Sequence, residues 1–91
     1  MPLAHGDPES IRTFARMLAE FSEISHDKLA RLRSFLGEMA GSTWSDAQYH
    51  DFEERFSEVD RQIHAALLKV QEEQVPRLLA LAARLDEYER T

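Results

Sequence analysis

The sequence predicts an all-α protein folded as an antiparallel two-helix hairpin, and three observations support this prediction. Glycine and proline are rare, with three of each in 91 residues, a composition that favours helix. Apolar residues recur at three- and four-residue steps in two long segments, and no segment alternates as a strand would. The only convincing break between them lies at residues 40–45. We therefore expect helices over about residues 8–40 and 46–90, in one domain (residues 8–91) that follows a flexible N-terminus (residues 1–7).

The first helix has a clear start and a long apolar seam. Asp7 can cap free N–H groups, Pro8 suits the first helical position, and Glu9 complements the helix dipole. The seam has heptad spacing and consists of Ile11, Phe14, Leu18, Phe21, Leu32, Phe35 and Met39. Ser25 and Lys28 interrupt it, which indicates either a local shift in packing or a polar layer that fixes register.

The turn and the second helix follow from local signals. Gly41 suits a left-handed helix cap, and Ser45 with Gln48 forms a capping box. The second seam consists of Tyr49, Phe52, Phe56, Val59, Ile63, Ala66 and Val70. Pro76 removes a backbone donor and clashes with the preceding turn, so we expect a kinked continuation there, with a third short helix as the alternative.

The two helix lengths predict an assembly. Residues 8–39 would span roughly 48 Å and residues 46–75 roughly 45 Å at the rise of an α-helix, which places Ile11 near Val75. The apolar segment after Pro76 would then overhang the first helix, and an exposed apolar patch usually marks an interface. A hairpin also needs another layer to complete its core. We therefore expect a four-helix bundle or a larger oligomer.

Charge and composition exclude several classes of protein. The net charge is −6, and residues 46–60 hold six acids and one base, so we expect no nucleic-acid partner. The longest apolar run, Leu78–Ala83, has six residues against about 20 for a membrane span. Residues 1–7 do not resemble a cleaved signal peptide. We expect a soluble, cytoplasmic chain without membrane insertion.

No arrangement of residues predicts an enzyme, a catalytic residue, a bound metal or a cofactor. There is no cysteine and no glycine-rich phosphate loop. Glu23 and His26 form the Glu-x-x-His pair of di-iron helical bundles, and Asp60 and His64 occupy the matching stretch of the second helix. This metal-binding alternative stays open, although Lys28 would oppose a cation.

The segment from Trp44 to Phe52 resembles the tryptophan turn of the WXG100 (ESX-like) family, whose members are helical hairpins of about this length. Trp44 matches the family's tryptophan-x-glycine motif, whereas Asp46 stands at the glycine position. A glycine there would permit a tight turn. Asp46 can instead serve the start of the second helix, where a carboxylate complements the dipole.

The resemblance implies that such hairpins dimerise and are exported by a type VII secretion system with a membrane ATPase. The family's C-terminal signal, a tyrosine with an acid four residues later, is not formed by Tyr88. The expected partners are a second copy, a paralogous hairpin or the secretion ATPase, and export would need no cleaved signal peptide. The alternative is an intracellular scaffold module. The residues expected to bind partners are Trp44, Asp46, Leu78, Leu81, Leu85 and Tyr88.

Overall fold

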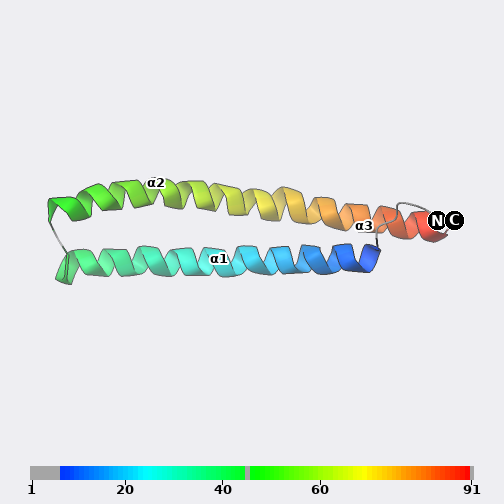
Figure 1. The fold of residues 1–91 in the computed structure, drawn as a ribbon, viewed down its shortest axis with the longest axis horizontal. Helices are drawn as coiled ribbons and strands as arrows, with labels where there is room; N and C mark the ends of the chain where they lie inside the picture. The colour runs from blue at the N-terminus through cyan, green and yellow to red at the C-terminus, as the bar shows by residue number, and fades with distance from the viewer. Residues whose placement is uncertain (1–6, 45, 91) are drawn as a thin grey trace. The chain divides into compact units, whose positions relative to one another are not determined.

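The computed structural model describes residues 7–44 and 46–90, and every regular element among them is helical (Figure 1). Helix α1 spans Pro8–Ser42 and helix α2 spans Ala47–Lys69. A π-helical turn, η1, covers Val70–Gln74 and leads directly into helix α3, Val75–Arg90. The all-α prediction is confirmed for this part of the chain. The expected flexibility of residues 1–6 and the Ser45 capping box lie outside the described residues.

The chain forms two compact units. Of the described residues, unit 1 combines 7–22 with 68–90, and unit 2 comprises 23–44 and 46–67. Unit 2 is a helical hairpin in which α1 and α2 run antiparallel from the turn (Figure 1). In unit 1 the start of α1 lies beside α3.

Helix α1 begins as the sequence predicts. One carboxylate oxygen of Asp7 accepts the Glu9 N–H at 3.1 Å, and the other accepts the Ser10 hydroxyl at 3.0 Å. The cap satisfies groups that would otherwise lack an intrahelical partner. Its far end differs from the prediction, because Gly41 is helical and no described glycine has a positive φ. Thr43 and Trp44 N–H instead bond back to the Met39 carbonyl, at 3.0 and 2.8 Å.

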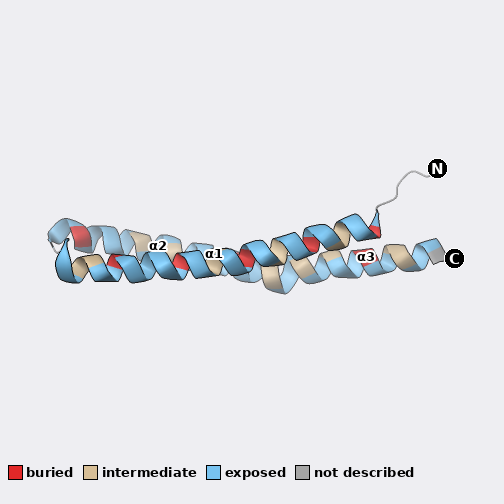
Figure 2. Ribbon diagram, turned by 90° about the horizontal axis from the view of Figure 1, so that it is seen from below, coloured by how far each residue is buried: buried red, intermediate tan, exposed pale blue. Residues whose placement is uncertain are grey.

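The buried stripe of α1 coincides only in part with the predicted seam, of which Ile11, Leu18 and Met39 are half-buried. The buried residues recur every seventh position at Ala15, Ser22, Leu29 and Leu36, and they form narrow bands between exposed turns (Figure 2). Phe14, Phe21 and Phe35 of the predicted seam are 54%, 58% and 62% exposed. Small side chains allow a closer approach of two helices than phenylalanine does. The interruption at Lys28 is thereby explained, since Lys28 is exposed and lies outside the packed stripe.

Unit 1 contradicts the predicted overhang. Arg12 forms an ion pair with Asp86, and Ala15, Ala19, Val75 and Leu79 line one hollow between α1 and α3. Ala82 is fully buried. Residues 75–86 therefore lie along the first turns of α1. The expected register was wrong, because Val75 lines this hollow with Ala15 and Ala19 and not with Ile11.

The helix passes Pro76 by way of the π turn. The Val75 N–H bonds to the Val70 carbonyl five residues earlier, which is the spacing of a π-helix. In a regular α-helix the proline ring clashes with the preceding turn. The wider π turn relieves this clash. The chain stays helical from Ala47 to Arg90, so the expected continuation is present and a separating loop is not.

Candidate interaction surface

Unit 2 has an apolar groove between α1 and α2. Its volume is about 210 Å³. Its lining is entirely apolar and comprises Leu32, Phe35, Leu36, Met39, Phe52 and Phe56. Leu32 and Phe35 also line a second hollow with Lys28 and Arg31. We call these eight residues the unit 2 face.

The unit 2 face holds side chains that hairpin packing leaves uncovered. Leu32 is 58% exposed and Phe52 is 46% exposed, although large apolar residues dominate most interiors. Ile24, Val59 and Ile63 of the same unit are also exposed. The hairpin thus packs through its smaller stripe, while its larger side chains form a surface suited to a further helical layer.

The Trp44 turn lies at the end of unit 2 and is held by Asp46. The Asp46 Oδ1 atom accepts the Trp44 indole N–H at 3.0 Å and the Tyr49 backbone N–H at 3.1 Å. The second bond makes Asp46 an N-cap of α2, whereas the sequence predicts only that Asp46 complements the dipole at the start of this helix. The indole contacts the Tyr49 ring edge-on at 5.4 Å and the Phe52 ring at 5.9 Å, measured between centroids. Trp44 is therefore half-buried against the rings of Tyr49 and Phe52, whereas Asp46 is exposed.

Tyr49 ties the two helices of unit 2 together at this end. Its side chain is 2% exposed, its hydroxyl donates to the Leu36 carbonyl at 3.0 Å, and Glu53 Oε2 lies 3.3 Å from that hydroxyl. Burial raises the pKa of the Tyr49 phenol, and the negative charge of Glu53 raises it further. The neutral phenol is thus the form that the folded hairpin holds.

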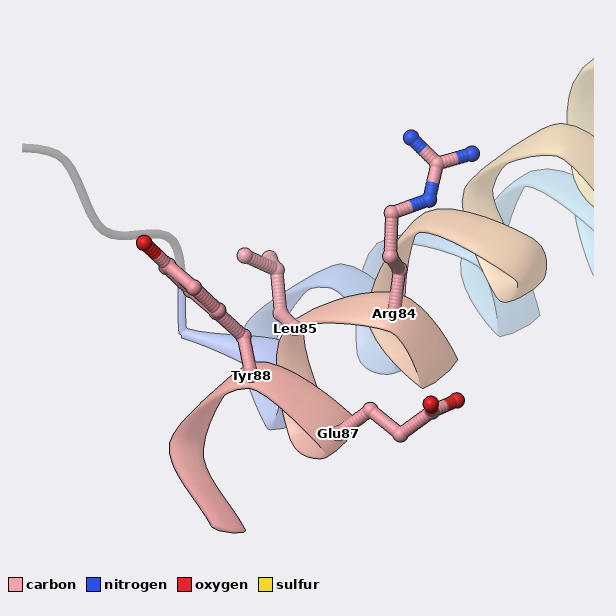
Figure 3. A pocket seen from close by; sticks show the side chains of 4 residues that line it. All are labelled: Arg84, Leu85, Glu87 and Tyr88. Carbon is pink, nitrogen blue, oxygen red and sulfur yellow. The ribbon is translucent and has the colours of Figure 1, made fainter. Parts of the chain in front are cut away.

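The predicted C-terminal binding residues belong to unit 1, and the Trp44 turn belongs to unit 2. Leu78 and Leu85 are half-buried, whereas Leu81 is 40% and Tyr88 is 79% exposed. Figure 3 shows Leu85 and Tyr88 beside Arg84 and Glu87 at the end of α3. These four residues surround an open hollow of about 440 Å³. All of them belong to one helix, so this hollow offers a ligand no opposing wall from another described element.

Two polar pairs join α1 to α2 within unit 2. The Arg33 guanidinium donates to both Asp60 oxygens, at 3.0 and 3.2 Å, and these bonds with the Asp60 charge raise the pKa of Arg33. His26 and His64 meet edge-to-face with ring centroids 4.8 Å apart. Two residues of the metal-binding alternative, His26 and His64, are thus in contact. Among the described residues, however, no three His, Cys, Asp or Glu side chains lie close enough together to hold a metal ion.

Sequence reasoning placed Leu32, Phe35, Phe52 and Phe56 inside the hairpin and so missed them as a surface. A signal was present in the second apolar pattern of α1, at Ala15, Leu29 and Leu36 with Ser22 between them. Two parallel heptad patterns on one helix indicate two packing surfaces.

The fold and the face define a helical hairpin with an exposed apolar surface. No described helix combines the length and apolar character needed to cross a membrane. Comparison with models of known families found no match, and neither the curated proteins nor the solved structures contained one.

Proposed function

We propose that this chain is a non-enzymatic, WXG100-like helical hairpin that self-associates through the unit 2 face, with a second copy of the chain as the occupant. The observation that carries the proposal is the exposure of Phe35, Leu32 and Phe52 beside a fully packed inner stripe. Two such faces would complete a four-helix bundle.

The composition of the unit 2 face supports a second copy as the occupant. Six of its eight residues are apolar. A self-complementary apolar face is also what a two-fold symmetric dimer requires.

Light scattering coupled to size-exclusion chromatography tests the proposal across a range of concentrations. We expect a dimer or a multiple of it. Phe35→Gln should raise the dissociation constant at least about a hundredfold, since each copy loses roughly 2 kcal/mol of apolar burial. Ser34→Gln changes the exposed neighbouring residue and should leave the mass unchanged. A helical monomer at every concentration would refute self-association.

Export by a type VII secretion system is the cellular role that we propose from the resemblance. The anchored, half-buried Trp44 at the end of the hairpin supports it, because a held tryptophan is a good interface anchor. The protein should then occur in culture supernatant. Trp44→Ala should abolish this, while Trp44→Phe controls for ring packing. Retention of the wild-type protein in cells would favour an intracellular interaction module instead.

A further inference from the structure

We infer that each helix of the hairpin packs beside the unlike helix of the second copy, so that α1 neighbours the partner's α2 and the two α2 helices lie diagonally. This inference rests on the proposed self-association through the unit 2 face. The inference specifies which helix of the second copy lies beside which helix of the first. The apolar lining of the unit 2 face is compatible with more than one such arrangement.

The two helices of unit 2 differ in charge. Residues 23–42 of α1 hold three acids and three bases, whereas residues 47–67 of α2 hold five acids and two bases. The net charges are therefore zero and −3, with histidines neutral. Placing α2 beside the partner's α2 would bring two helices of charge −3 together, and like charges across an interface disfavour that arrangement.

The positive charge of the unit 2 face lies along the α1 side. Lys28 and Arg31 line the hollow that adjoins Leu32 and Phe35. Arg31 is paired with Asp27 at 3.4 Å, whereas Lys28 has no carboxylate within ion-pair distance among the described residues. In a like-beside-like bundle these cations would approach their own copies. In the unlike arrangement Lys28 faces the acidic α2 of the partner.

Flanking charges of this kind set partner choice and orientation in helical bundles more than they set affinity. The apolar core of the face supplies the affinity and is compatible with either arrangement. The charge pattern therefore selects the unlike pairing without requiring additional apolar contacts.

Carbodiimide coupling, which joins an amine directly to a carboxylate, tests this arrangement. Lys28 and Lys69 are the only lysines of the chain, so the links are easily assigned by mass spectrometry. Equal amounts of ¹⁵N-labelled and unlabelled protein are mixed, and links between the two isotopes identify contacts between copies. We expect Lys28 to couple to α2 carboxylates of the other copy, chiefly Glu54, because Asp51 and Glu58 already pair with Arg55 and Arg61.

Links from Lys28 to Glu23, Asp27 or Glu38 of the other copy would overturn the inference, and so would a dimer without intermolecular Lys28 links. Lys28→Arg keeps the positive charge but lacks the amine. It should therefore remove the links and leave the mass of the oligomer in solution unchanged. Lys28→Glu should raise the dissociation constant about three- to tenfold. A monomeric mass in the same sample would instead refute the proposed self-association, so the two failures are distinguishable.

Discussion

Asp46 connects the tryptophan turn to the second helix through one oxygen atom. Its Oδ1 accepts both the indole N–H and the capping N–H of Tyr49. A glycine at this position could do neither. The aspartate therefore stabilises the turn and holds the indole in place. The sequence could predict the favourable charge at the start of α2, but the indole bond depends on the fold of the turn.

The environment of Tyr49 predicts that the folded chain loses stability at alkaline pH. Its phenol pKa is raised in the folded chain by burial and by Glu53. The associated stability is therefore fully present below the ordinary tyrosine pKa of about 10 and is lost as pH rises through the folded value. Circular dichroism melting curves at pH 8 to 11.5 measure this.

The wild-type melting temperature should fall more steeply above pH 10 than that of Tyr49→Phe. At pH 8 the variant should melt about 5 °C lower, because it lacks the bond to the Leu36 carbonyl. Tyr88→Phe alters an exposed ring and should keep the wild-type profile. Equal alkaline slopes for Tyr49→Phe and wild type would contradict this assignment.

At the scale of the elements, close helix packing in unit 1 depends on small residues. Ala82 of α3 is fully buried and Ala15 of α1 is 1% exposed. Ala82→Leu should therefore overpack the contact and lower the free energy of unfolding by about 1–3 kcal/mol. Urea denaturation measures the change.

Ala83→Leu is the matched control, because Ala83 is the adjacent helical residue and is exposed. It should change stability by less than about 0.5 kcal/mol. If both substitutions had equal effects, α3 would not pack on α1 through Ala82.

The helices were predictable and the packed face of α1 was not. The Asp7 cap, the break after residue 42 and the continuation past Pro76 all have local causes that the sequence displays. The choice between two adjacent heptad patterns has no local cause. Hydrophobicity favours the pattern with Phe14, Phe21 and Phe35, whereas close approach favours the pattern with Ala15, and only the helices' mutual packing decides between them. The unit 2 face was missed for this reason.

At the scale of the whole molecule, the two compact units predict separable stabilities. A chain that ends at Val75 would lose Leu79, which lines a hollow with Ala15 and Ala19 of α1, and Asp86, which pairs with Arg12. Hydrogen exchange should then show lost protection over residues 8–22, with protection retained within residues 29–67. The full chain is the reference. Uniform loss across both units would show instead that they fold as one cooperative body.

The π turn also constrains how the length of this chain can change over evolution. A π turn is equivalent to one residue inserted into an α-helix. A descendant that lost a single codon between Val70 and Gln74 would restore α-helical winding and leave the turns on either side in nearly the same orientation, because about four α-helical residues turn the chain as far as five π-helical ones. Ala82 would keep its orientation, but Pro76 would again clash with the preceding turn. We therefore expect homologues that have one residue fewer between Lys69 and Ala82 to lack the proline.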